Sequence, residues 1–199
     1  MTPELQGFIF DLDGTLVDSR LDFPAMRRET GCPEGTGLLE HIDGLADASE
    51  RERAAAIVHR HEMDCAAGAS WMPGAHAILR TLSAKRVPMG IVTRNSRQAT
   101  ELTLSSLGAP PIDLVTREDA PPKPDPAGLL QLAARWGLDP LRLAYVGDFR
   151  YDLQAATAAG MCAILYHQPR NRDYAAAADQ VIHHFAELLA WLPERTSTG

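Results

Sequence analysis

Several carboxylates in this sequence follow short apolar segments. Asp11 and Asp13 come directly after one such segment and before a glycine, and Asp148 and Asp152 follow another one later in the chain. Carboxylates that are crowded together repel one another unless a cation lies among them or protons stay bound. Hard oxygen ligands of this kind suit Mg²⁺, which proteins usually bind through one or two carboxylates and a substrate phosphate. If the fold brings the two pairs together, they predict a magnesium site.

Two further side chains could bind phosphate at such a site. Thr93 follows an apolar segment, and Lys123 lies among prolines in the loop after the next one. A hydroxyl and an ammonium group would hold phosphate oxygens, and phosphoryl transfer depends mostly on positioning and charge neutralisation. One carboxylate can attack phosphorus and form an aspartyl phosphate, while a second protonates the leaving oxygen and later activates water. Arg94 is a further candidate contact for phosphate or substrate.

Each of these signals also has an ordinary structural explanation. Asp13-Gly14 is a common turn dipeptide, Lys123 could be a solvated loop lysine, and Asp148 could serve a helix end. Their shared placement after successive apolar segments favours a common site. A calcium-binding EF-hand is excluded, because positions five, six and twelve of the loop starting at Asp11 hold the wrong residues, namely Thr15, Leu16 and Asp22.

The elements that must position these side chains alternate between strands and helices. Strands are expected at residues 7–10, 87–93, 112–115, 143–146, 162–166 and 180–183, and helices at 95–108, 124–137, 151–160, 173–178 and 185–192. Asn95 or Ser96 would cap the first of these helices. Asp125 would cap the second, with Pro126 at its first position and Gly137 at its end. This alternation predicts an α/β fold with a Rossmann-like parallel sheet and helices on both faces, in which ligands bind at the carboxyl ends of the strands.

Residues 20–73 interrupt the alternation. They are rich in Arg, Glu, His and Ala and show no clear strand pattern, so we expect a small helical insertion there, with a loop at 31–37 and a return hinge at 68–74. The predicted organisation is therefore a catalytic core formed by residues 1–19 and 74–199, and a helical cap formed by residues 20–73.

Composition excludes several classes of function. The chain has 199 residues and a net charge of −7, which argues against binding to nucleic acid or an anionic membrane surface. Its three cysteines are widely spaced and do not predict a disulfide framework. We see neither a secretory signal nor an apolar run of the roughly 20 residues that a membrane span needs. We therefore expect a cytoplasmic protein; its oligomeric state is left open.

The candidate residues resemble four motifs of the haloacid dehalogenase-like (HAD) superfamily of hydrolases, in that family's order. The first motif, D-x-D-G-T, is matched by the residues from Asp11 to Thr15. The second, a Ser or Thr after the second strand, is matched by Thr93, and the third, a lysine in K-P-x-P, by Lys123. The fourth, G-D-x-x-x-D, is matched by residues 147–152, although Phe149 takes a position that is often small and polar.

The resemblance implies a role for each matched residue. Asp11 would be the nucleophile and a ligand of Mg²⁺, and Asp13 would be the general acid and base and would give its backbone carbonyl to the metal. Asp148 would complete the metal site, and Asp152 would bind the metal directly or through water. Thr93 and Lys123 would hold the phosphoryl group. The insertion after the first motif lies where the family places a helical cap.

The resemblance also narrows the reaction. Asp13 favours a phosphatase or phosphomutase over the founding dehalogenases, which resemble D-x-Y at this point and use no Mg²⁺. Residues 20–73 contain no lysine, whereas the superfamily's sugar phosphomutases use cap lysine and histidine, so hydrolysis is preferred. The expected protein is a phosphoglycolate-phosphatase-like enzyme with a short cap, acting on a small phosphorylated metabolite. The alternatives are a phosphomutase and a non-catalytic regulatory protein that binds a phosphoryl ligand.

One other group of side chains could suggest a metal site. His61 and Cys65 would share a helix face, but His59 would lie off it. Because a fourth ligand at a typical zinc spacing is missing, an ordinary helix is the preferred interpretation.

Overall fold

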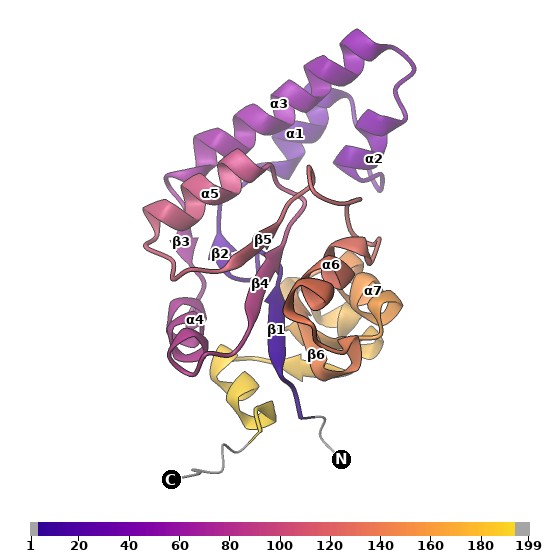
Figure 1. The fold of residues 1–199 in the computed structure, drawn as a ribbon. Coiled ribbons are helices and arrows are strands. Elements are labelled where there is room, and N and C mark those ends of the chain that lie inside the picture. Colours follow the sequence, from indigo (N-terminus) through magenta and orange to yellow (C-terminus); the bar gives the residue numbers. More distant parts are fainter. Residues whose placement is uncertain (1–3, 194–199) are drawn as a thin grey trace. The chain divides into compact units, whose positions relative to one another are not determined.

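The computed structural model describes residues 4–193 and contains a six-stranded sheet (Figure 1). The strands lie in the order β5-β4-β1-β6-β7-β8, and every neighbouring pair is parallel. Their bounds are β1 Gly7–Phe10, β4 Met89–Val92, β5 Asp113–Val115, β6 Leu143–Gly147, β7 Cys162–Tyr166 and β8 Gln180–Ile182. This confirms the expected α/β, Rossmann-like fold.

Strand β1 lies between β4 and β6 in the interior of the sheet, and all four of its residues are buried. Phe10 aligns with Ile91 of β4 on one side and with Val146 of β6 on the other. Ile9 belongs to the core cluster that the helices of one face cover, whereas the ring of Phe10 lies 6.4 Å from that of Phe185. Side chains on both faces of the strand are thus buried, which is typical of central strands in parallel sheets.

Three helices pack on this sheet: α4 Ala75–Ala84, α6 Ala127–Trp136 and α7 Arg150–Ala159. Helix α6 begins one residue later than expected, since Pro126 is its N-cap and the Asp125 carboxylate accepts the N–H of Ala127 at 2.8 Å. Gly137 ends α6 in the left-handed conformation, as predicted.

The last two helical segments are 3₁₀ rather than α. They are η2 Pro169–Ala177 and η3 Phe185–Trp191, and a shorter one, η1 Pro140–Arg142, precedes β6. Alanine content and apolar spacing predicted helices at 173–178 and 185–192, but neither pattern distinguishes i→i+3 from i→i+4 hydrogen bonding in so short a segment.

The chain forms two compact units. The first contains the six-stranded sheet and comprises residues 4–18, 71–94 and 109–193. The second comprises residues 19–70 and 95–108 and contains α1 Phe23–Thr30, α2 Leu38–Asp43, α3 Ala48–Ala66 and α5 Arg97–Ser106. Helix α5, whose N-cap is Ser96 as expected, thus groups with the helices of the insertion. The division into a catalytic core and a cap stays a prediction.

A small strand in the insertion was not expected. Strands β2 Val17–Asp18 and β3 Ser70–Trp71 form a two-stranded sheet, so the segment 68–74 is not only a hinge. Two residues are too few to show the alternation of apolar and polar side chains by which a strand is recognised in a sequence.

The histidines and cysteine of α3 have other contacts than a metal ion. His61 lies 3.0 Å from a Glu29 oxygen, the His59 ring lies 3.1 Å from the Ser96 hydroxyl, and the Cys65 thiol donates to a backbone carbonyl. Ordinary helix packing, the preferred interpretation, agrees with these contacts. Within residues 4–193, no helix is both long and apolar enough to cross a membrane.

Candidate active site

The predicted site residues stand where the parallel strands end. Asp11 directly follows β1, Thr93 follows β4, and Asp148 follows β6. Because all three strands run in the same direction and are neighbours in the sheet, these residues share one edge of it. Helix α7 begins two residues after Asp148 and carries Asp152 in its first turn.

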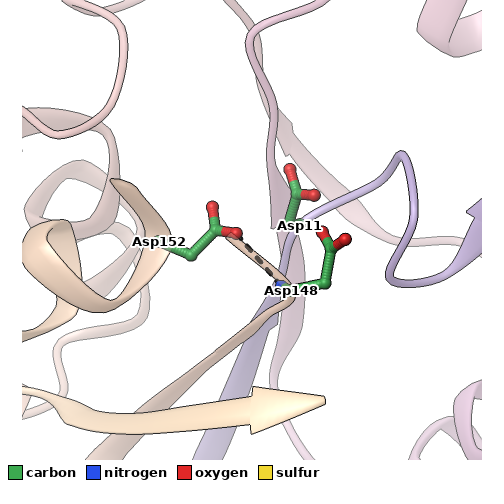
Figure 2. Close-up of side chains that lie close together, drawn as sticks. All are labelled: Asp11, Asp148 and Asp152. Carbon is green, nitrogen blue, oxygen red and sulfur yellow. Dashed lines mark hydrogen bonds between the residues drawn. The ribbon is translucent and has the colours of Figure 1, made fainter. Parts of the chain in front are cut away.

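Three carboxylates converge at this edge. Asp11, Asp148 and Asp152 each offer an oxygen, and these oxygens lie within 4.8 Å of one another (Figure 2). All three residues are buried, with exposed fractions of 8%, 8% and 3%. The Asp13 carboxylate is not part of this group; Asp13 is half-buried and makes a β-bridge with Val17.

Lys123 lies within this cluster. Its Nζ donates to Asp11 Oδ1 at 2.5 Å, to Asp152 Oδ1 at 2.7 Å and to the Tyr145 hydroxyl at 2.7 Å. An ammonium group has three N–H donors, so each of them has a partner inside the protein. Lys123 is therefore buried, and it joins Asp11, which follows β1, to Tyr145 of β6 and Asp152 of α7.

Tyr145 is a member of the cluster that the sequence analysis missed. It lies on β6 with no exposed surface, and its hydroxyl donates to the carbonyl of Val92, the residue before Thr93, at 2.9 Å. Burial and the neighbouring Asp152 and Asp11 charges raise the pKa of Tyr145 well above its usual value, so the phenol stays protonated. A tyrosine in an otherwise aliphatic buried strand was the available signal, because a buried hydroxyl needs a hydrogen-bond partner.

Asp152 is held by the turn that precedes α7. Its Oδ2 accepts the backbone N–H groups of Asp148 and Phe149 at 3.1 and 2.9 Å, which leaves Oδ1 for Lys123. The Asp152 side chain packs directly on Gly147, where a Cβ atom would overlap it. The glycine of the fourth motif thus makes room for the carboxylate five residues later.

Asp148 is held from two sides. Its Oδ1 accepts from the Thr15 hydroxyl at 3.2 Å, and its Oδ2 pairs with the Arg170 guanidinium at 2.8 Å. Gly14 lies close by with a φ of +81°, and a Cβ there would lie 2.6 Å from Asp148 Oδ2. Gly14 is therefore required both by the backbone conformation and by the space that Asp148 occupies.

Burial and mutual repulsion govern the charges of the cluster. Burial raises the pKa of Asp11 well above its usual range, with Lys123 opposing and the carboxylates of Asp152 and Asp148 adding to the shift. Burial and Asp152 also raise the pKa of Asp148, against Arg170 and Thr15. Burial alone would lower the pKa of Lys123, but Asp11 and Asp152 raise it overall. The carboxyl groups of Asp11 and Asp148 therefore hold protons more tightly here than in water, and a bound cation would oppose this.

Thr93 and Arg94, the other two candidates for phosphate binding, have contacts that differ from each other. Thr93 is buried at the end of β4, and its N–H donates to the carbonyl of Val115. The Arg94 guanidinium donates to the carbonyl of Lys123 and lies over the Tyr151 ring, 5.1 Å from its centre. Arg94 thus links the segments that carry Thr93, Lys123 and Asp152, and its proposed contact with phosphate stays a prediction.

The sequence analysis passed over a segment that also reaches the cluster, namely residues 167–172, which lead from β7 into the first turn of η2 and are called the loop after β7 below. Three of its side chains contact the first and fourth motifs. Gln168 donates to the carbonyl of Gly14 at 2.5 Å, Arg170 pairs with Asp148, and the buried Asn171 amide donates to the Asp148 and Tyr166 carbonyls at 2.9 and 3.0 Å. The loop's position in the sequence could have indicated this contact, because it follows β7, which ends at the same edge of the sheet as β6.

The donor set fits a hard divalent cation. Three carboxylate oxygens lie within 4.8 Å, and two cationic side chains, Lys123 and Arg170, pair with them, so that one negative charge is left over when all are ionised. Oxygen ligands in this number suit Mg²⁺ better than zinc, which favours nitrogen and sulfur.

Residues 5–160 match the family model described as haloacid dehalogenase-like hydrolase. The chain belongs to this family. It is 33% identical over 217 aligned residues to a phosphoglycolate phosphatase of Rhodospirillum rubrum, with 92% of this chain and 89% of the relative covered. It is 26% identical to a validoxylamine A 7′-phosphate phosphatase of Streptomyces hygroscopicus subsp. limoneus, over 90% of this chain and 94% of that one.

Solved structures show the same fold. A hydrolase from Pseudomonas syringae superimposes with a TM-score of 0.77 at 23% identity, covering 94% of this chain and 97% of the other. The match to the family model ends at residue 160, so the loop that contains Gln168, Arg170 and Asn171 lies beyond it.

Proposed function

We propose that this HAD hydrolase is a Mg²⁺-dependent phosphatase that hydrolyses a small phosphorylated metabolite through an aspartyl phosphate at Asp11. The observation that carries the proposal is the position of Lys123, whose ammonium group bridges Asp11 and Asp152 while Asp148 lies beside them. This arrangement combines a carboxylate that can attack phosphorus with a cation that can neutralise a phosphoryl oxygen and a third carboxylate for the metal.

In the first half of the proposed reaction, Lys123, Asp11 and Asp13 each have a separate role. Lys123 holds Asp11 Oδ1, and this contact favours the ionised form of a carboxylate whose pKa burial raises. An ionised Asp11 oxygen forms a bond to phosphorus as the bond from phosphorus to the leaving oxygen breaks. Asp13 gives its proton to that oxygen, so that a neutral alcohol departs.

In the second half, Asp13, now ionised, takes a proton from water. The resulting hydroxide attacks phosphorus, the bond to Asp11 breaks, and inorganic phosphate is released. Asp11, Asp148 and Asp152 would hold Mg²⁺, which supplies charge neutralisation for the phosphoryl group when it is bound. Thr93 and Arg94 complete the proposed phosphate-binding set with Lys123.

The named relatives act on chemically different compounds, since one is a phosphoglycolate phosphatase and another a validoxylamine A 7′-phosphate phosphatase. What these names share is a phosphoric ester on a small molecule, and we propose that class of substrate for this chain. A cytoplasmic location stays part of this proposal.

The test is hydrolysis of a panel of phosphorylated metabolites, phosphoglycolate included, by the wild type and by Asp11→Asn, each with Mg²⁺ or with EDTA. Phosphate release should require both Mg²⁺ and Asp11, and acid-quenched wild type should carry a phosphoryl group on Asp11 by mass spectrometry. Asp173→Asn is the matched control, because its side chain is 89% exposed. Full activity of Asp11→Asn in a clean preparation would refute the proposal.

A further inference from the structure

Two cations of different accessibility offset all but one of the negative charges of the cluster. Lys123 forms ion pairs with Asp11 and Asp152, and its side chain is 4% exposed. Arg170 forms its ion pair in the cluster with Oδ2 of Asp148, and its side chain is 62% exposed. The buried lysine is a fixed part of the site, whereas the guanidinium reaches Asp148 from the solvent side.

We propose that Arg170 is a built-in counter-cation that competes with the divalent metal ion for Asp148. In the metal-free protein it balances the one carboxylate that Lys123 does not contact, and metal binding weakens or breaks this pair. The inference rests on the proposed function in one respect, namely that the cluster binds a divalent cation.

The loop around Arg170 holds it at this place. Asn171, 2% exposed, bonds to the Asp148 carbonyl and to the Tyr166 carbonyl at the end of β7, and its own Oδ1 accepts the N–H of Gln168 at 2.8 Å. The Gln168 side chain in turn bonds to the Gly14 carbonyl. The backbone on either side of Arg170 is therefore tied to the same two segments that carry Asp11 and Asp148.

Electrostatics decides the sign of the effect. A positive charge that lies against a metal ligand repels a divalent cation bound to that ligand, and water at the exposed guanidinium screens this repulsion only in part. Removal of the Arg170 charge leaves the metal-free cluster with two excess negative charges in place of one. The extra repulsion makes the metal-free protein less stable, and the more negative site binds the metal more tightly. Bound metal therefore restores more stability to the variant than to the wild type, because the free energy of binding adds to folding stability.

The alternative role for Arg170 is to orient the Asp148 carboxylate for the metal. Partners of metal ligands often position them, and their loss then weakens metal binding about 10- to 100-fold. The two roles predict opposite changes in affinity, so a binding measurement separates them without any measurement of turnover.

The experiment is isothermal titration of Mg²⁺ into the full chain for the wild type and three variants. Arg170→Gln should bind Mg²⁺ on the order of tenfold more tightly, as expected for the loss of one partly screened charge. Arg170→Lys, which keeps the charge, should stay near the wild type. Arg172→Gln is the matched control, because Arg172 lies in the same loop, is 80% exposed and pairs only loosely with Asp173 at 3.6 Å.

Thermal unfolding supplies the second readout. In EDTA, Arg170→Gln should melt below the wild type, and saturating Mg²⁺ should narrow this difference. Weaker or unchanged Mg²⁺ binding by Arg170→Gln would overturn the inference while leaving the proposed function intact. Asp148→Asn separates the two: if the wild type binds Mg²⁺ no better than Asp148→Asn does, the metal site of the proposed function fails, and the inference fails with it.

Discussion

Lys123 donates all three of its N–H groups to protein acceptors, and this limits how it can act on a substrate. To bind a phosphoryl oxygen it must exchange or share one of these bonds. Tyr145 is the neutral acceptor of the three, and bonds between charged partners are the stronger ones. The bond to Tyr145 is therefore the one that a phosphoryl oxygen would replace at the least cost.

The raised pKa values of Asp11 and Asp148 predict how stabilisation by Mg²⁺ depends on pH. A carboxylate whose pKa is raised by folding stabilises the folded state below its unfolded pKa, and this stabilisation is lost as the pH rises through the folded pKa. Metal binding requires the ionised carboxylates, so it releases protons and opposes that loss. We expect saturating Mg²⁺ to raise the melting temperature more at about pH 7.5 than at about pH 5.5.

Differential scanning calorimetry at the two pH values, with Mg²⁺ or EDTA, checks this expectation. Titrations in two buffers of different ionisation enthalpy would reveal the released protons. Asp148→Asn, which lacks one of the proposed ligands, should lose most of the Mg²⁺ effect at both pH values. An equal stabilisation at both pH values would contradict the idea that these carboxylates hold protons in the metal-free protein.

At the scale of elements, the sequence predicts most of what positions the site. Strands β1, β4 and β6 are short buried apolar runs, and each ends at a residue type that can bind a metal or phosphate. The contribution of the loop after β7 could not be predicted in the same way. Arg170 meets Asp148 only because β6 and β7 are in parallel register, and a pairing between residues 22 apart leaves no periodic pattern in the sequence.

The turn from β6 to α7 carries a prediction of its own. Gly147→Ala would place a methyl group on the Asp152 side chain and displace its carboxylate from Lys123. We expect about a 10- to 100-fold loss of Mg²⁺ affinity and of activity, together with about 1–3 kcal/mol of lost stability from overpacking. Titration with Mg²⁺ and urea unfolding would measure the two effects.

Gly68→Ala is the control for this change. A Cβ on Gly68 would lie 3.8 Å from the Cys65 carbonyl, which is ordinary van der Waals contact. This variant should keep both its Mg²⁺ affinity and its stability. If Gly147→Ala also binds Mg²⁺ like the wild type, the glycine of the fourth motif has no part in placing Asp152.

At the scale of the whole molecule, the grouping of helix α5 is a feature that strand–helix alternation does not predict. Strand–helix alternation assigned residues 95–108 to the sheet-containing core, since a helix that follows a strand normally covers the sheet. In the structure these residues form a compact unit with 19–70 instead. The contacts responsible join distant parts of the chain: the buried Glu62 carboxylate accepts the Ser96 N–H at 3.2 Å, and the His59 ring lies against the Ser96 hydroxyl.

These contacts predict that residues 19–70 need α5 in order to fold. Helix α3 packs against both α1 and α5, and a helix without its packing partners is marginal in water. A fragment of residues 19–70 should be largely unfolded by circular dichroism, whereas the same fragment joined to 95–108 by a Gly/Ser linker should be helical and melt cooperatively. Glu62→Ala in the joined fragment should lower that melting temperature, because the Ser96 N–H loses a buried acceptor. Cooperative melting of residues 19–70 alone would instead mean that the insertion is a self-sufficient helical unit and that α5 only attaches to it.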